Sequence, residues 1–263
     1  MAKHDPEENE TEVGKARLFV PDALVEDAEV ALDPGQSHYL RHVLRLAPGD
    51  PVQLFNGRDG EWLARIDRFA KQGGTAIAER MTRTQPPAPP ALVLAFAPIR
   101  KQRLDVLIEK AVELGATRLC PVLTERTSHG RLKRDRIEAQ IREAAEQCER
   151  LDLPELDDPQ PLPAFLQDWG TDIPLLLAAE AGEAKPLAEL ALEFPAGSPI
   201  AFVIGPEGGF SARELAFLTA NPLLRAVGLG PRILRAETAA IAVLALWQGL
   251  RGDGASRPPG RVG

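Results

Sequence analysis

The chain has 263 residues, a formal net charge of −7, and 44% hydrophobic against 26% charged residues, which is typical of a globular protein of one or two domains. Its longest apolar stretches, Ala91–Ile99 and Ile241–Trp247, are far shorter than the roughly 20 residues of a membrane-spanning helix, and the acidic N-terminus lacks the layout of a signal peptide. The two cysteines, Cys120 and Cys148, and the four scattered histidines form no metal-binding pattern. We therefore expect a cytoplasmic protein with reduced thiols, no bound metal and no membrane association.

The N-terminal third of the chain predicts a small β domain behind a tail. Residues 1–15 are acidic and lack apolar periodicity, so we expect them to be disordered. Within residues 16–84, short strand-like segments are separated by glycine-containing turns. The expected strands are Arg17–Val20, Pro51–Phe55, Glu61–Arg68 and Thr75–Arg80. One helix interrupts them, with Ser37 as its expected N-cap. Its apolar face is made by Tyr39, Leu40, Val43, Leu44 and Leu46.

A proline-rich run at residues 85–90 separates this domain from the rest of the chain. It cannot form a helix or a central strand and is expected to be a semi-rigid linker. Residues 91–250 then alternate apolar runs with helical patterns. The expected strands are Leu92–Ala97, Arg118–Thr124, Ile173–Ala179, Ile200–Gly205 and Leu224–Leu229. The expected helices are Gln102–Leu114, Arg134–Leu151, Pro186–Phe194, Ser211–Leu218 and Glu237–Leu250. This alternation predicts an α/β fold with a parallel sheet covered on both faces, followed by a loose tail at residues 251–263.

Two glycine-containing loops follow strands of this sheet, at the edge where open α/β sheets bind ligands. The first is Ile204–Phe210, in which Gly208 and Gly209 allow positive φ and close approach of a ligand to the backbone. The second runs from Gly228 to Thr238 and enters an apolar helix. It opens like GxGxxG, but Ile233 stands at the third glycine position, and neither loop contains a lysine. The pair suits an uncharged or zwitterionic ligand held by backbone groups; the alternative is two structural turns.

The negative net charge conceals a concentration of basic residues. Residues 1–12 and 152–195 together carry a charge of −13, so the remaining residues sum to about +6. The basic residues gather between positions 41 and 71 and between positions 126 and 136. This distribution could build a surface that binds nucleic-acid phosphates, although charge alone favours the alternative of a solvated basic surface.

The strings IGPEGGFS and LGPRILRAETA, about twenty residues apart after a series of strands and helices, are specific to one family. On these strings the chain resembles the ribosomal RNA small subunit methyltransferase E family, in the SPOUT class of RNA methyltransferases. Four further strings support the resemblance, which extends from Arg17 to about Gln248. They are RLFV at 17–20, HYLRHVLRLAPGD at 38–50, EKAVELGATRLCPVLTERTS at 109–128 and REAAEQCER at 142–150.

The resemblance implies a fold, a reaction and partners. It implies a PUA-like β-barrel that binds RNA, at residues 16–84, and a SPOUT methyltransferase domain with a deep trefoil knot, at residues 91–250. The implied reaction is methylation of ring nitrogen N3 of one uridine in 16S (small-subunit) ribosomal RNA, within the assembled or assembling subunit. The implied methyl donor is S-adenosylmethionine, and the implied state is a homodimer. A dimer also agrees with Glu237–Leu250, which is apolar nearly all round and must be buried on more than one face.

The resemblance also implies the site residues. The donor-binding residues would be Leu177, Ala178, Glu180, Ile204, Gly205, Pro206, Glu207, Gly208, Gly209, Leu229, Gly230, Ile233, Leu234 and Arg235. The RNA-binding residues would be Arg41, Arg45, Arg126, Arg131, Lys133 and Arg232. The chain departs from the family at Ser128–Arg131, where a longer stretch with a lysine is usual, so the basic residue that approaches the RNA there is open.

The chemistry suggests roles for two residues at the start of the last helix. Methyl transfer from a sulfonium is an in-line displacement, and uridine N3 is a poor nucleophile until its proton leaves. We expect Arg235 to stabilise negative charge on the uracil, and Glu237 to orient the uracil or accept its proton. The alternatives are an ion pair between these two residues, or a favourable position of Glu237 on the helix dipole.

Three other classes of protein stay open at this point. A non-enzymatic RNA-binding module would leave the two glycine loops without a role. A nucleotide-binding oxidoreductase is disfavoured by Ile233. Another SPOUT methyltransferase, acting on transfer RNA or on a ribose hydroxyl, is disfavoured by the PUA-like domain and the REAAEQC string, through the resemblance alone.

Overall fold

The computed structural model describes residues 14–127, 132–170, 172–179 and 184–257. These residues form two compact units. Unit 1 comprises the described residues up to Pro87 together with Ala145–Asp152, and unit 2 comprises Ala88–Ala144 and Leu153–Arg257 without the gaps just given. The division at 87/88 falls within the proline-rich run, whereas the assignment of residues 145–152 to unit 1 had no signal in the sequence. No helix among the described residues is long and apolar enough to span a membrane.

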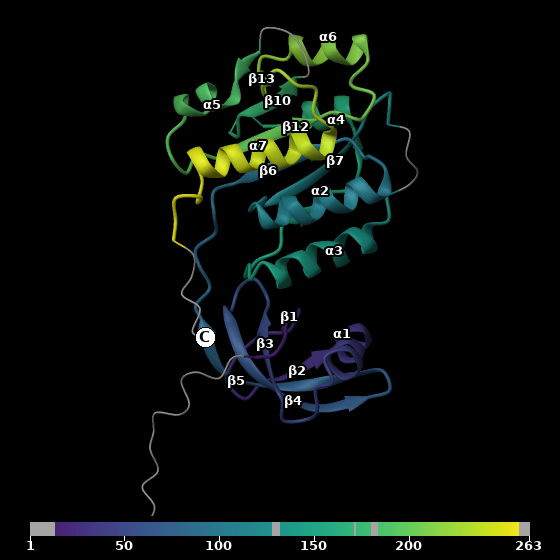
Figure 1. The fold of residues 1–263 in the computed structure, drawn as a ribbon, viewed down its shortest axis with the longest axis vertical. Helices are drawn as coiled ribbons and strands as arrows, with labels where there is room; N and C mark the ends of the chain where they lie inside the picture. The colour runs from purple at the N-terminus through teal and green to yellow at the C-terminus, as the bar shows by residue number, and fades with distance from the viewer. Residues whose placement is uncertain (1–13, 128–131, 171, 180–183, 258–263) are drawn as a thin grey trace, which may run out of the picture. The chain divides into compact units, whose positions relative to one another are not determined.

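Unit 1 is built on a five-stranded sheet in the order β1-β3-β4-β5-β2 (Figure 1). The strands are β1 (Arg17–Phe19), β2 (Glu29–Leu32), β3 (Pro51–Phe55), β4 (Glu61–Ala70) and β5 (Gly73–Arg83). The pairing of β1 with β3 is parallel and the other pairings are antiparallel. Buried side chains such as Leu18, Val30, Leu54 and Ile66 fill its core. Four of these strands were predicted; β2 was not, because Glu29–Leu32 alternates for only four residues.

The helix of unit 1 begins earlier than predicted. Helix α1 (Pro34–His38) continues into a π-helical turn, η1 (Tyr39–Val43). Its N-cap is Asp33, whose side chain accepts from Gln36 N at 2.8 Å while the Gln36 side chain accepts from Asp33 N at 3.0 Å. Ser37 as N-cap was therefore wrong, since Asp33 with Pro34 at the first helical position makes the complete capping box.

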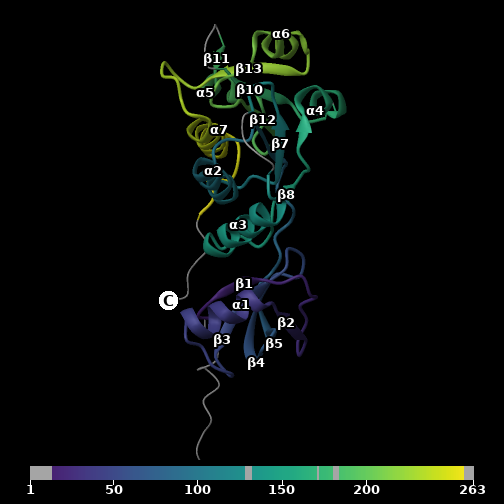
Figure 2. The same ribbon diagram turned by 90° about the vertical axis from the view of Figure 1, so that its right-hand side faces the viewer.

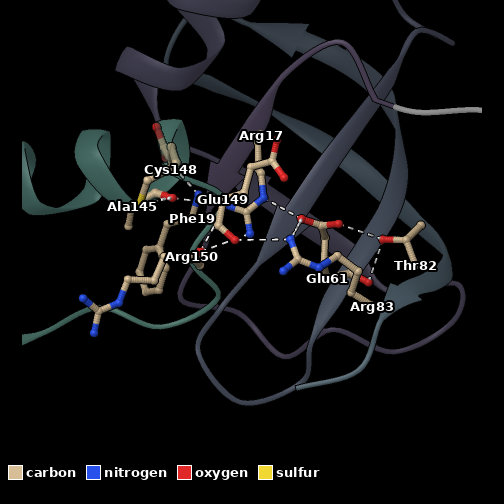
Figure 3. Close-up of polar contacts among 10 residues, drawn as sticks. Arg17, Phe19, Glu61, Thr82, Arg83, Ala145, Cys148, Glu149 and Arg150 are labelled. Atoms are coloured by element: carbon tan, nitrogen blue, oxygen red, sulfur yellow. Dashed lines mark hydrogen bonds and ion pairs between the residues drawn. The ribbon is translucent and has the colours of Figure 1, made fainter. Parts of the chain in front are cut away.

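Residues 145–152 are held in unit 1 by polar contacts with β1 and β5 (Figure 3). The guanidinium of Arg17 forms an ion pair with Glu61 and donates to the carbonyl oxygens of Ala145 (3.2 Å) and Arg150 (3.0 Å). Phe19 N donates to Glu146 Oε1 at 2.9 Å. The last carbonyls of a helix lack partners within the helix, and Arg17 supplies donors for them at the end of α3. The strings RLFV and REAAEQCER, which carried part of the resemblance, meet in this network.

Unit 2 is built on a parallel sheet in the order β11-β13-β10-β12-β6-β7-β8, with β9 paired to β7 (Figure 1). The strands are β6 (Leu92–Phe96), β7 (Arg118–Leu123), β8 (Glu155–Leu156), β9 (Gln160–Pro161), β10 (Leu175–Ala179), β11 (Lys185–Pro186), β12 (Ile200–Ile204) and β13 (Leu224–Gly228). Every pairing between these strands is parallel. The five long strands were predicted; the two-residue strands are too short to leave a pattern.

Helices cover both faces of this sheet, as predicted. The helices are α2 (Lys101–Glu113), α3 (Arg134–Gln147), α4 (Leu162–Asp168), α5 (Leu187–Leu190), α6 (Ala212–Ala220) and α7 (Ala236–Leu250), with a 3₁₀ turn η2 (Ala191–Glu193). Figure 2 shows α2 and α7 on one side of the sheet and α4 on the other. On the first side Trp247 packs edge-on against Phe202. On the other, Phe165 and Leu218 join the buried cluster with the strand residue Val203.

Helix α3 ends earlier than predicted, and helix α7 is only partly covered. Helix α3 ends at Gln147, four residues before the predicted Leu151, and Glu149 has a positive φ of 61° that does not continue the helix. Helix α7 buries Ala240, Val243, Leu244 and Trp247 but leaves Leu246 38% and Leu250 37% exposed. One face of an apolar helix is thus uncovered within the described chain.

Candidate active site

The carboxyl ends of β10, β12 and β13 lie side by side, because β10 pairs with both of the other strands. The segments that follow these strands line a pocket. Its lining is Ala178, Ala179, Ile204, Gly205, Leu229, Gly230, Arg232, Leu234, Ala236 and Ala239. The structure thus brings together six of the predicted donor-binding residues and one predicted RNA-binding residue, Arg232. Alanine and glycine make up six of the ten lining residues, so few long side chains separate a ligand from the backbone.

The pocket is small. It encloses about 40 Å³, enough for little more than a water molecule. A nucleoside-sized ligand would therefore extend over the adjoining loop, where Ile233 is 80% exposed. Ile233 lies outside the pocket lining, and so do Arg235, Glu207, Gly208 and Gly209.

Glycine occupies the positions of the two loops for different structural reasons. A Cβ on Gly205 would lie 2.8 Å from Cε2 of Phe210, so the ring packs directly over the Gly205 backbone. Gly209 and Gly230 have φ of 66° and 96°, which favour glycine. Gly208 has no positive φ, and a Cβ there would meet Arg126 side-chain atoms at 3.7 Å and beyond, which is ordinary contact. Of these two adjacent glycines, which both allow a positive φ, Gly209 adopts one and Gly208 does not.

Two side chains fix the loop between β12 and α6. Glu214 closes the predicted capping box of α6, accepting from Ser211 N at 2.8 Å while Ser211 Oγ accepts from Glu214 N at 3.1 Å. The other oxygen of this buried carboxylate accepts from the backbone N of Glu125, after β7, at 2.7 Å. Arg126, next in the chain, donates to the carbonyl oxygen of Gly208 at 2.7 Å. The residue predicted to bind RNA thus braces a glycine loop of the site.

The two predicted catalytic residues stand apart in their contacts. Glu237, in the first turn of α7, is 13% exposed and pairs with Arg103 of α2, with Nε and Oε1 3.6 Å apart. Arg103 also pairs with Glu207 of the β12–α6 loop, with Nη1 and Oε1 3.0 Å apart. Arg235 is the exposed N-cap of α7, and its side chain makes no hydrogen bond or ion pair with any residue that the structure describes. The alternative of an Arg235–Glu237 ion pair is therefore wrong, because Arg103 occupies that position.

The remaining predicted site residues are scattered. Leu177 and Pro206 are buried and could offer only backbone groups to a ligand. Lys133 is exposed just before α3. Two residues belong to unit 1: Arg41 lies over the ring of Phe69, and Arg45, after η1, has a φ of 58°. Glu180 and Arg131 lie outside the described residues.

Sequence reasoning missed Arg103 and Phe210. Arg103 lies about a hundred residues before Glu207 and carries no motif of its own. The signal that would find it is the pairing of β12 with β6, because that pairing places the helix after β6 beside the loop after β12.

Comparisons with known proteins agree with this geometry. Residues 86–248 match an RNA methyltransferase domain family, and residues 32–68 match an RNA methyltransferase PUA domain family. The chain is 32% identical to the ribosomal RNA small subunit methyltransferase E of Rickettsia conorii over 87% of this chain and 93% of that protein. It is 34% identical to that of Synechocystis over 87% and 76% of the two chains.

Solved structures are similar over most of the chain. One is a Legionella pneumophila methyltransferase in complex with S-adenosylmethionine, with a TM-score of 0.80 and 29% identity, covering 90% of this chain and 98% of that one. Another is the ribosomal RNA small subunit methyltransferase E of Neisseria gonorrhoeae bound to S-adenosylmethionine, with a TM-score of 0.77, 28% identity and the same coverage. With two matched domain families, relatives above 30% identity and a parallel sheet ending in two glycine loops, the chain belongs to the ribosomal RNA small subunit methyltransferase E family.

Proposed function

We propose that this protein methylates ring nitrogen N3 of a uridine in 16S ribosomal RNA, with S-adenosylmethionine as the methyl donor. The observation that carries the proposal is the pocket at the ends of β10, β12 and β13, whose lining includes four alanines and two glycines. The guanidinium of Arg235, beside it in the chain, has no partner among the described residues. The names of the family's relatives supply the class of RNA, and the resemblance supplies the base and its ring nitrogen.

The residues of the pocket fit such a donor. Ala178, Ala179, Ala236 and Ala239 leave space that longer side chains would fill, and Gly205 exposes its backbone beside the ring of Phe210. Adenine and ribose are uncharged and suit backbone donors and acceptors of this kind. The bound donor supplies an electrophilic methyl group on its sulfonium.

The protein's own residues would then prepare the uracil. The N3 proton must leave before or during attack, so negative charge develops on the ring. Arg235, exposed and without a partner among the described residues, is free to stabilise that charge. Glu237 keeps Oε2 without a hydrogen-bond partner among the described residues, so this oxygen is available to orient a ligand.

Each unit has exposed basic residues that could contact RNA. Lys133 is exposed in unit 2, and Arg41 and Arg45 are exposed in unit 1. Arg232 is exposed at the pocket itself. A surface of this kind predicts salt-sensitive RNA binding in spite of the acidic composition, because each neutralised phosphate releases counterions. The cytoplasm is the proposed compartment, since that is where bacterial ribosomal RNA is found.

We further propose that the protein is a homodimer. Leu246 and Leu250 form an exposed apolar edge of α7, and Ile233 is exposed in the loop before that helix. A second copy of the chain would bury them. Light scattering at micromolar concentration that finds a stable monomer would contradict the dimer.

Mass spectrometry of 16S ribosomal RNA tests the function. A strain that lacks the gene should lack one N3-methylated uridine, and the wild-type gene should restore it. The Arg235→Ala variant should bind donor with little change in affinity but transfer methyl about 10²–10³-fold more slowly, because the contact it removes is made in the transition state. If Arg235→Ala loses donor affinity in proportion to rate, Arg235 binds the donor or braces the loop, and the proposed catalytic role fails.

A further inference from the structure

Arg103 joins two segments of the active site that are far apart in the sequence. It lies in the first turn of α2, and its guanidinium reaches Glu207 on the loop after β12 and Glu237 on α7. Its side chain is 32% exposed, and those of the two carboxylates are 24% and 13% exposed. A partly buried guanidinium with two carboxylate partners is held in one orientation, unlike a long side chain on an open surface.

The contact leaves Glu237 with one oxygen to spare. Oε1 faces Arg103, whereas Oε2 is buried and has no hydrogen-bond partner among the described residues. A buried carboxylate oxygen without a partner is costly, so a protein keeps one where a ligand or water completes it. Ala236, which lines the pocket, is the residue directly before Glu237, so this carboxylate belongs to the same turn of α7 as the pocket wall.

Lysine could not replace the arginine in this arrangement. A guanidinium presents several N–H groups in one plane, so here Nη1 donates to Glu207 at 3.0 Å while Nε lies 3.6 Å from Glu237 as an ion pair. An ammonium is a single point charge and would favour one carboxylate over the other.

We propose that Arg103 is a positioning residue for methyl transfer. It fixes Oε1 of Glu237 and anchors the β12–α6 loop through Glu207, so that Oε2 of Glu237 accepts a hydrogen bond from an O–H or N–H group of the bound nucleoside. That group belongs either to the methyl donor or to the target uracil. The inference rests on the proposed function, since it assigns a ligand to the same pocket.

A double-mutant cycle tests the inference. The variants are Arg103→Gln, Glu237→Gln and the double variant, with Arg100→Gln as the control, because Arg100 is the exposed basic residue directly before α2. Donor affinity is measured by calorimetry, and methyl transfer by single-turnover rates at saturating donor. We expect each single variant to lose about tenfold or more in one of the two quantities, and the double variant to match Glu237→Gln within about twofold. Arg100→Gln should match the wild type.

The two readouts separate the two sources of the hydrogen bond. A loss in donor affinity assigns the partner group to S-adenosylmethionine, and a loss in rate at saturating donor assigns it to the uracil. Arg103→Lys keeps the charge and the fold, and should recover part of the loss but less than half of it on a logarithmic scale. Losses that multiply in the double variant, or an equal loss in Arg100→Gln, overturn the inference.

The outcome is also distinct from failure of the proposed function. If the wild-type protein methylates no uridine in 16S ribosomal RNA, the proposed function fails, while the donor-affinity cycle still reports whether Arg103 acts through Glu237. If the wild type is active and the cycle is additive in both readouts, the role of Arg103 alone is refuted. Should Arg103→Gln fail to fold by circular dichroism, the same cycle is measured with Arg103→Lys, and additivity there refutes the inference equally.

Discussion

The substitutions Gly205→Ala and Gly208→Ala add one methyl group each to the same loop and should differ in their effect on stability. At Gly205 the new Cβ would lie 2.8 Å from Cε2 of Phe210 and 3.2 Å from its Cδ2 and Cζ. Real carbon contacts begin near 3.5 Å, so the ring must move by several tenths of an ångström. Phe210 packs against the buried cluster that contains Val203 and Leu218, and that cluster resists the movement.

The magnitude follows from the cost of overpacking. Forcing an extra methyl group into a packed site costs about 1–3 kcal/mol. For a unit of this size, that lowers Tm by roughly 2–12 °C. Gly205→Ala should therefore destabilise unit 2, and its donor affinity should fall as the pocket wall shifts.

Gly208→Ala is the matched control for the effect on stability. Its Cβ would meet only Arg126 side-chain atoms, at 3.7 and 3.8 Å, and its φ is not in the positive range. Alanine at such a site is neutral or stabilises by about 0.4–1 kcal/mol, because it narrows the unfolded ensemble. If the donor approaches the Gly208 backbone, as the resemblance implies, affinity should fall about tenfold or more with no loss of stability; Gly208→Val should abolish binding.

Thermal unfolding and calorimetric titration with S-adenosylmethionine decide between these outcomes. Equal Tm values for Gly205→Ala and the wild type would refute the packing argument at Phe210. Unchanged donor affinity in Gly208→Ala would remove Gly208 from the donor site.

Three further outcomes are expected from the structure. Arg17→Met should lower the free energy of unfolding by about 3–5 kcal/mol in a urea titration, because the carboxylate of Glu61, which is 6% exposed, loses its main partner. A loss below about 1 kcal/mol would contradict a stabilising buried ion pair. Cys120 should resist a thiol reagent at pH 8 until urea is added, because burial raises the pKa of its thiol and the thiolate is the reactive form; rapid labelling of Cys120 in the native protein would be inconsistent with that. Hydrogen bonds from Leu24 N and Asn56 hold the pKa of Asp59 below its usual value, so its contribution to stability is present above about pH 4 and is lost as the pH falls further. In Asp59→Asn, the free energy of unfolding should therefore fall less steeply as the pH is lowered below about 4. An unchanged pH dependence would contradict this role of Asp59.

The sequence predicted the parts of the fold that buried apolar runs dictate. Ile200–Ile204 is buried at every position, and so is Leu92–Phe96, because each lies inside a parallel sheet covered on both faces. The capping box of Ser211 and Glu214 was equally visible, since its two partners are three residues apart. Strands such as β8 and β11 have two residues each and are defined by their neighbours rather than by any local pattern. The trefoil knot, implied by the resemblance, stays a prediction.

The active site was predictable where it is local and not where it depends on topology. The two glycine loops could be predicted from the sequence, because Gly209 and Gly230 adopt backbone conformations that few other residues adopt. The ion-pair partner of Glu237 could not be predicted in this way. Arg235 lies two residues away in the sequence, whereas the fold supplies Arg103 from another helix. Arg126 shows the same limit: its charge suggested phosphate binding, and its nearest contact in the structure is a backbone carbonyl.

The contacts of Arg17 bear on how the protein folds as it is synthesised. The last strand of the N-terminal sheet ends at Arg83, yet the carbonyl groups that Arg17 needs belong to Ala145 and Arg150. At about 5–20 residues per second, a ribosome takes several seconds to make the intervening chain. During that interval the Arg17 guanidinium can pair with the Glu61 carboxylate but lacks the carbonyl oxygens of Ala145 and Arg150. A fragment that stops at the proline-rich run would keep this defect permanently, so the N-terminal unit is not a separable module in the ordinary sense of the word.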